Sequence, residues 1–137
     1  MLRYRQFEHR ALLSLALFSA GSALGGGIAM LVGGIEFPLE WLDGSMFANY
    51  TVPAIVLAAN VGGSQMIAAA AMIRREPWRL ETVVVAGVIM MGWIVVEIAI
   101  VGSESGLMRT LQIIYFVLGL AEAVLAGFGL PRRATAA

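Results

Sequence analysis

Two glutamates, Glu97 and Glu122, lie within long apolar stretches of the sequence. An acidic side chain at the centre of a bilayer costs about 2.5 to 3.5 kcal/mol on insertion scales, so such a group usually faces a bundle interior, a partner or a water-filled path. At 1.5 Å per helical residue, Glu122 lies about 3 Å inward of the middle of its stretch and Glu97 about 8 to 9 Å outward, so roughly 12 Å separates them along the axis. This separation excludes a carboxylate dyad that shares one proton.

Other polar side chains recur near these glutamates at helical spacing. Gln112, Tyr115 and Glu122 follow one another at intervals of three and seven residues, which places them on one face of a helix. Trp93 lies one helical turn before Glu97. A bundle that turns these faces inward would hold an internal polar column, running from the outer half of the membrane to just below its midplane and made of Glu97, Gln112, Tyr115, Asn60, Gln65 and Glu122.

Three roles for this column are open at the level of sequence. A protonated carboxyl can donate a hydrogen bond to Asn60, to Gln65 or to a backbone carbonyl. The polar groups then either join helices, at about 0.6 kcal/mol for an average pair in a membrane, or relay protons or cations, or contact a ligand or partner. Of these three roles, the sequence favours the joining of helices.

Several kinds of chemistry lack the residues that they need. The chain has no cysteine, and its one histidine, His9, lies outside the apolar stretches. Thiol redox chemistry, thiolate or histidine metal sites, histidine-ligated haem and an intramembrane Ser-His-Asp arrangement are therefore excluded. The run from Gly25 to Gly27 lies inside an apolar stretch, so it is not a phosphate loop. We expect no catalytic residue, no metal, no cofactor and no enzymatic activity, and the net charge of zero indicates no nucleic-acid partner.

The composition predicts the elements that must position these residues. Of the 137 residues 60% are apolar and 13% charged, with a mean hydropathy of +0.86, whereas soluble domains are about 45 to 50% apolar and about 25% charged. A membrane span takes roughly 20 residues. The sequence therefore predicts an all-α integral membrane protein, an antiparallel four-helix transmembrane bundle in a single domain over residues 1–137, with spans at residues 11–34, 51–73, 82–102 and 110–130.

The arginines predict the orientation of the bundle. Eight of the nine basic residues precede the first span, lie between the second and third spans or follow the fourth, and Arg109 alone is on the other side. Cytoplasmic loops carry the excess of basic residues, so the N- and C-termini should be cytoplasmic in a bacterial inner membrane. A cleaved signal peptide is the competing interpretation of the N-terminus, but the apolar run continues to Val32, beyond the length of a signal-peptide core.

The outer loop at residues 35–50 is apolar enough to lie on the membrane. The loop forms either a lid over the bundle or a turn by which the chain re-enters the membrane. In the second case Trp41 anchors the turn, and Asp43 and Gly44 end it.

A stripe of small residues in the first span predicts close helix packing, because in lipid small residues let backbones approach. This seam packs against another span of the same chain or against a second copy, and its members are Gly21, Ser22, Gly25 and Gly26.

Four segments carry a resemblance: residues 42–53, the pair Arg74 and Arg75, residues 92–97 and residues 111–116. Together they resemble a family of small four-span bacterial membrane proteins. The family pattern has a proline where this chain has Met46, and often a glutamine where it has Glu97, which implies that hydrogen bonding can replace titration at that position. The resemblance implies no activity.

Two functions fit these observations. The first is a non-enzymatic accessory or structural subunit, or a bundle that binds lipid or another apolar ligand between its helices. The alternative is a small dimeric proton-coupled transporter in which Glu97 and Glu122 titrate. The expected partners are the lipid bilayer, a second copy or a larger membrane complex, and a lipid or small apolar molecule.

Overall fold

The computed structural model describes residues 2–135, and every regular element in that range is helical. The elements are α1 (Leu2–Leu31), a short 3-10 helix η1 (Leu39–Leu42), α2 (Thr51–Val56), a π-helical segment η2 (Leu57–Gly62), α3 (Gly63–Ile73), α4 (Arg79–Val101) and α5 (Gly106–Ala134). Because α2, η2 and α3 follow one another without a break, they form one long helix. Four helices are long and apolar enough to cross a membrane, as in a multi-pass membrane protein, which confirms the predicted all-helical class.

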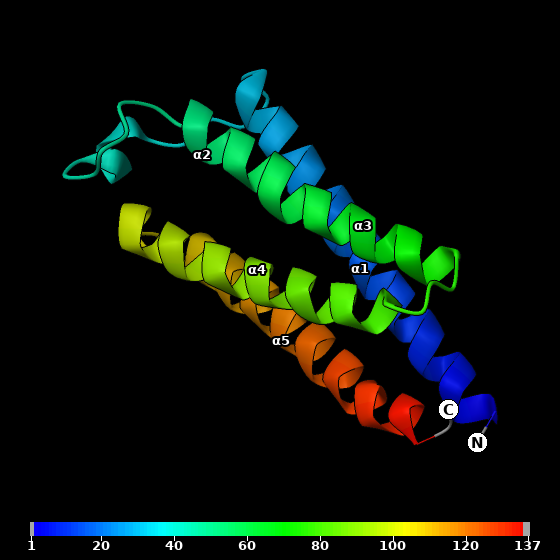
Figure 1. Cartoon of the computed structure of the whole chain (residues 1–137). Helices are drawn as coiled ribbons and strands as arrows, with labels where there is room; N and C mark the ends of the chain where they lie inside the picture. The colour runs from blue at the N-terminus through cyan, green and yellow to red at the C-terminus, as the bar shows by residue number, and fades with distance from the viewer. Residues whose placement is uncertain (1, 136–137) are drawn as a thin grey trace.

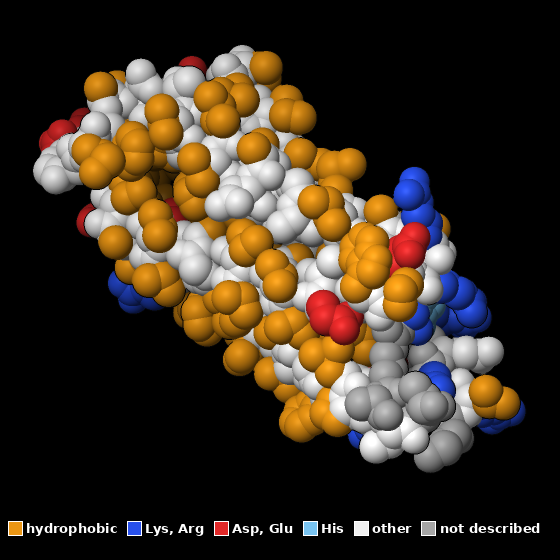
Figure 2. Space-filling model, viewed as in Figure 1, with side chains coloured by type: hydrophobic (Ala, Val, Ile, Leu, Met, Phe, Trp, Pro, Cys, Tyr) orange, Lys and Arg blue, Asp and Glu red, His pale blue; other side chains and the backbone are white. Residues whose placement is uncertain are grey.

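The helices are arranged as two pairs (Figure 1). Helices α4 and α5 pack along much of their length, and α1 packs against the long helix made of α2, η2 and α3. The pairs meet where α3 turns into α4, and they diverge toward the end that carries the outer loop. The first turns of α1 and the end of α5 lie at the opposite end, which we call the arginine end because basic side chains gather there (Figures 1 and 2).

Helix bounds and apolar stretches coincide in the second span and differ elsewhere. The second helical span runs over Thr51–Ile73, as predicted. Helix α1 begins at Leu2 instead of residue 11, and α5 extends from Gly106 to Ala134 instead of over residues 110–130. Backbone hydrogen bonds continue through polar residues as well as apolar ones, whereas hydropathy marks only the part of a helix that suits lipid.

The outer surface of the helices is apolar. Large side chains such as Ile67 and Val95 are each 58% exposed, and Figure 2 shows apolar side chains spread over the middle of the molecule. An apolar surface of this extent is unfavourable in water, and the hydrocarbon core of a bilayer is the solvent that suits it.

The interior is packed most closely in the half nearer the arginine end. Small side chains there let all four helical spans approach one another, and the cluster contains Leu12, Ala16, Ala68, Ala69, Met72, Leu80, Val83, Ala86 and Ala126. Two smaller clusters follow, one around Ala23, Val61 and Met90 and one around Leu42, Val101 and Met108 at the loop end. The divergence of the helix pairs therefore leaves space in the half nearer the outer loop.

The close contact between α1 and the second span lies at Gly27, not at the predicted seam. A Cβ atom on Gly27 would lie 2.7 Å from both the Ala54 carbonyl oxygen and the Ala58 Cβ atom. Gly21 and Gly25 are exposed with no atom within 4 Å of a Cβ position, and Gly26 meets only Leu57, at 3.8 Å.

The helical phase explains why the contact within the chain lies at Gly27 and not at the predicted seam, whose packing against a second copy stays a prediction. Ala20, Ala23 and Gly27 recur at spacings of three and four and are all buried, so they define the inner face, and Gly21 and Gly25 lie outside it. Ser22 is half-buried, and its hydroxyl donates to the Phe18 carbonyl oxygen of its own helix at 2.7 Å.

Alanine at Gly27 should destabilise the protein, because the added Cβ atom would collide with backbone as well as side-chain atoms of the second span. Overpacking of this kind costs about 1–3 kcal/mol. Gly25→Ala is the matched control on the same helix, and it should leave the melting temperature in detergent unchanged or slightly higher, since alanine favours helix over glycine. Equal losses of stability in Gly27→Ala and Gly25→Ala would contradict a close contact between Gly27 and the second span.

Candidate functional site

A buried polar cluster joins three helices at Glu122 of α5. The Gln65 amide of α3 donates to Glu122 Oε2 at 2.6 Å, and the Ser19 hydroxyl of α1 donates to Oε1 at 3.3 Å. All three side chains are 0% exposed. Each carboxyl oxygen thus accepts one hydrogen bond from a different helix, so the cluster ties α1, α3 and α5 together.

Gln65 has one group without a partner in this cluster. Its Oε1 atom is buried and accepts no hydrogen bond. Reversing the amide would let Oε1 accept a proton carried by Glu122, but it would leave the amide nitrogen without that bond. Gln65 Oε1 is therefore a buried acceptor that the side chains of this cluster leave without a donor.

A second polar cluster lies where α4 turns into α5. The Gln112 amide donates to Glu97 Oε1 at 3.3 Å and to the Gly102 carbonyl oxygen at 2.9 Å, and Gln112 Oε1 accepts the Ser103 hydroxyl at 2.6 Å. Gly102 ends α4 with φ +68° and ψ −153°, a backbone conformation suited to glycine. This turn directs the carbonyl to Gln112 and so fixes the amide beside Glu97.

The outer loop covers the loop end of the bundle. Leu42 of η1 is buried against Val101 and Met108. The Phe37 ring lies 5.6 Å from the Tyr50 ring, and the Tyr50 hydroxyl donates to the Pro38 carbonyl oxygen at 2.9 Å. Partial burial raises the pKa of Tyr50 above its usual value.

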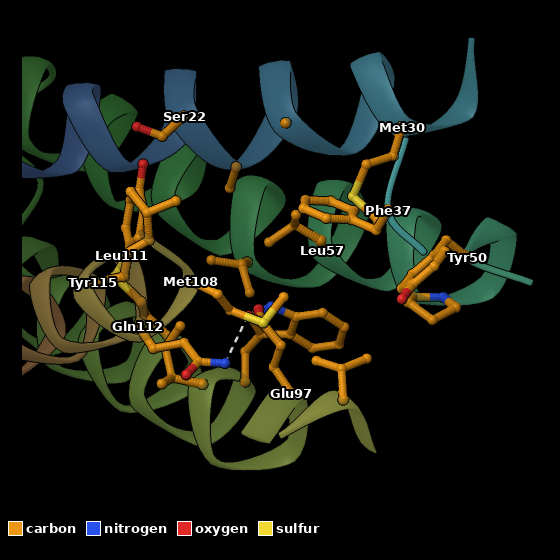
Figure 3. A pocket seen from close by; sticks show the side chains of 18 of the residues that line it. Ser22, Met30, Phe37, Tyr50, Leu57, Glu97, Met108, Leu111, Gln112 and Tyr115 are labelled. Carbon is orange, nitrogen blue, oxygen red and sulfur yellow. Dashed lines mark hydrogen bonds between the residues drawn. The ribbon is translucent and has the colours of Figure 1, made fainter. Parts of the chain in front are cut away.

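A cavity of about 270 Å³ lies between the two helix pairs, under this loop (Figure 3). Its lining is mostly apolar, and the polar groups in its wall include Glu97, Gln112 and Tyr115. The indole N–H of Trp93 is buried near Glu97 but does not reach hydrogen-bond geometry with it. Figure 3 shows Leu57 and Phe37 on one side of the space and the Gln112–Glu97 hydrogen bond on the other.

Ser19 belongs both to the wall of the cavity and to the Glu122 cluster. It lines the cavity, whereas Glu122 and Gln65 do not. Ser19 is therefore the residue that the cavity wall and the Glu122 cluster share.

The structure brings together most of the polar column that the sequence predicts, in two groups. Glu97, Gln112, Trp93 and Tyr115 line the cavity, and Gln65 meets Glu122 closer to the arginine end. Asn60 was predicted wrongly, because its side chain is exposed. It lies in the π-helical segment η2, whose i→i+5 hydrogen bonds shift the helical phase that the prediction assumed.

Ser19 and the Gly102 carbonyl belong to these clusters although neither was predicted from the sequence. Ser19 lies one helical turn before Ala23 on the buried face of α1. This spacing is the feature of the sequence that indicates that Ser19 points inward. A pattern of residue types does not show which side chain a backbone carbonyl will contact.

Comparison of the chain with protein-family models, with curated proteins and with solved structures finds no match. Within residues 2–135, no group of three His, Cys, Asp or Glu side chains is arranged to hold a metal ion. The case for function therefore depends on the geometry of the cavity and of the two clusters.

Proposed function

We propose that the protein is a non-enzymatic, multi-pass protein of the bacterial inner membrane that binds a small apolar ligand between its helices. In this proposal the four helices form an antiparallel bundle with both termini cytoplasmic, so the cavity lies in the outer half of the membrane. The observation that carries the proposal is this cavity, with a mostly apolar lining and a carboxyl in its wall.

The chemistry of the wall defines the ligand. Gln112 uses its amide hydrogens on Glu97 and on the Gly102 carbonyl and its oxygen on Ser103, so it positions Glu97 and has no donor left to offer. Glu97, the Tyr115 hydroxyl and the unpartnered Trp93 N–H remain to bind a polar group. The ligand is therefore apolar with a hydroxyl, carbonyl or amine.

The size of the cavity limits the ligand further. A cavity of about 150 Å³ accommodates benzene, so 270 Å³ accommodates a ring system or chain on the order of ten heavy atoms. Because the surrounding helix surfaces are apolar, such a molecule reaches the cavity from the lipid. Part of a larger lipid also fits if the remainder stays outside.

The experiment that tests this proposal is native mass spectrometry of the protein extracted from its own membranes in a mild detergent. A bound small apolar molecule or lipid would support ligand binding. A stoichiometric second protein with an empty cavity would support the accessory-subunit function instead, and a chain that carries neither would contradict both.

A side chain that fills the cavity should abolish this binding. Gly26 lines the cavity and has only an ordinary contact at its Cβ position, so in Gly26→Phe the ring can extend into the space. We expect at least a tenfold loss of retained ligand. Gly25→Phe is the matched control, because Gly25 does not line the cavity and its Cβ position is open. Retention by Gly26→Phe equal to that of Gly25→Phe would place the ligand elsewhere.

The position of Ser19 favours a second function, that of a dimeric proton-coupled transporter. The residue lines the cavity and its hydroxyl donates to the buried Glu122 carboxyl, so a coupling between ligand and proton would pass through Ser19. Under this function, Glu122→Gln in liposomes abolishes proton-linked flux while expression is unchanged. Unchanged flux would remove the transporter from consideration and leave ligand binding in place.

A further inference from the structure

A second hollow lies at the arginine end of the bundle, away from the apolar cavity. It is a groove of about 780 Å³ between the first turns of α1, the start of α4 and the end of α5. Its walls contain Tyr4, Arg5, Glu8, His9, Leu12, Met72, Arg79, Leu80, Gly129, Arg132 and Thr135. The groove shares no lining residue with the cavity under the outer loop, so it does not depend on the function proposed above.

Three guanidinium groups give this groove its charge. Arg5, Arg79 and Arg132 line it together with one carboxylate, that of Glu8. Three positive charges and one negative charge leave an excess of two, without any contribution from His9. These arginines come from three different helices, so the fold and not the local sequence assembles the positive groove.

Two of the guanidinium groups are held in place. Arg79 Nη1 donates to the carbonyl oxygens of Arg75 at 3.3 Å and of Glu76 at 3.0 Å. The guanidinium carbon of Arg132 lies 5.0 Å from the centre of the Tyr4 ring, a cation–π contact. Side chains fixed in this way lose little conformational entropy when an anion binds.

The floor of the groove is apolar. Leu12, Met72 and Leu80 line it and belong to the closely packed interior cluster. The groove lies where the apolar helix surfaces end and the arginines begin, which is the depth of lipid headgroups in a membrane. A ligand for this place needs an anionic group for the arginines and apolar chains for the adjoining helix surfaces.

We propose that this groove binds the phosphate group of an anionic phospholipid. Guanidinium groups bind phosphate oxygens through paired hydrogen bonds, and basic pockets between transmembrane helices on the cytoplasmic side bind anionic headgroups. The excess of two positive charges selects an anionic lipid over a zwitterionic one. The same phosphate chemistry occurs in free phosphate, so the test has to separate the two sources.

The test measures lipid retained by the full chain in native mass spectrometry. The protein in a neutral detergent receives equal amounts of phosphatidylglycerol and phosphatidylcholine with identical acyl chains. We expect phosphatidylglycerol to be retained preferentially, and the double variant Arg5→Gln with Arg132→Gln to lower its retention by roughly fivefold for each arginine removed.

The matched control removes the same charge from the same end of the bundle. Arg3→Gln with Arg10→Gln changes two arginines that do not line the groove, and it should retain phosphatidylglycerol like the unmodified protein. Equal losses in the two double variants would show only diffuse attraction to anionic lipid and overturn the proposal. If the groove double variant does not fold, Arg5→Gln alone makes the same comparison against Arg3→Gln.

Inorganic phosphate, added without phospholipid, distinguishes the sources. We expect it to leave the melting temperature of the protein unchanged at concentrations where phosphatidylglycerol raises it. Stabilisation by inorganic phosphate that the groove variant lacks, together with no preference for phosphatidylglycerol, would identify a free phosphate as the ligand and contradict the lipid proposal.

Discussion

Alanine at Gly87 or Gly119 is expected to separate α4 from α5 and to cause the largest loss of stability of any single methyl group added to this chain. A Cβ atom on Gly119 would lie 2.7 Å from the Gly87 carbonyl oxygen, and a Cβ atom on Gly87 would collide with the Gly119 carbonyl oxygen. Backbone atoms cannot rotate away as a side chain can. We expect losses at the upper end of the range of about 1–3 kcal/mol for overpacking.

Matched controls for these variants lie on the same two helices. Gly92 of α4 and Gly127 of α5 have no atom within 4 Å of a Cβ position, so Gly92→Ala and Gly127→Ala should leave the melting temperature unchanged or raise it slightly. Thermal unfolding in detergent, followed by circular dichroism, makes the comparison. If Gly87→Ala melts like Gly92→Ala, then α4 and α5 do not approach one another at these glycines.

The contact between the two glycines also affects the Glu122 cluster. A Cβ atom on Gly87 would lie 3.1 Å from Glu122 Cβ, so moving α5 away from α4 also moves the carboxyl. The double variant Gly87→Ala with Gly119→Ala should therefore lose less stability than the sum of the single losses, because the first methyl group already separates the helices.

Replacing Glu122 by leucine is the second change with a large expected effect. It leaves the Gln65 amide and the Ser19 hydroxyl without the acceptor that they share. A buried donor without a partner costs about 1–3 kcal/mol, although polar pairs in membrane proteins average about 0.6 kcal/mol. We expect a fall in melting temperature and looser packing of α1 against α5.

Glutamine at the same position should retain most of the stability. Its oxygen still accepts a hydrogen bond, and its amide can donate to Gln65 Oε1, the buried acceptor that has no donor in the unmodified protein. Thermal unfolding of Glu122→Gln beside Glu122→Leu checks this, with Ser19→Ala as a smaller loss of one donor. A Glu122→Gln variant as unstable as Glu122→Leu would show that the cluster needs a carboxyl rather than a hydrogen-bonding group.

Hydropathy and helical periodicity were sufficient for the elements of this fold and for half of its polar pairings. The second helical span begins at Thr51 and ends at Ile73, as the apolar stretch predicts. Glu97 pairs with Gln112 and Glu122 with Gln65, because polar groups in apolar helices find partners at matching depth. Depth follows from position along the chain, so a sequence contains this information.

The rotation of each helix about its axis was not available from the sequence. Asn60 is exposed although Gln65, five residues later, is buried, and the glycine of α1 in closest contact with the second span is Gly27 instead of Gly25. In a span that is apolar on all sides, the distribution of apolar residues does not distinguish the inner face from the lipid face. Only the packed helices select which small residue lies inside.

The cavity and the arginine groove belong to the tertiary structure alone. The cavity exists because the helix pairs diverge toward the outer loop, and the groove exists because the first turns of α1 meet the end of α5. Residue types and spacing predicted four apolar helices and the bounds of the second span, whereas α1 begins at Leu2 instead of residue 11. Packing decided which polar groups meet and where space remains, because it depends on contacts between residues as far apart as Ser19 and Glu122.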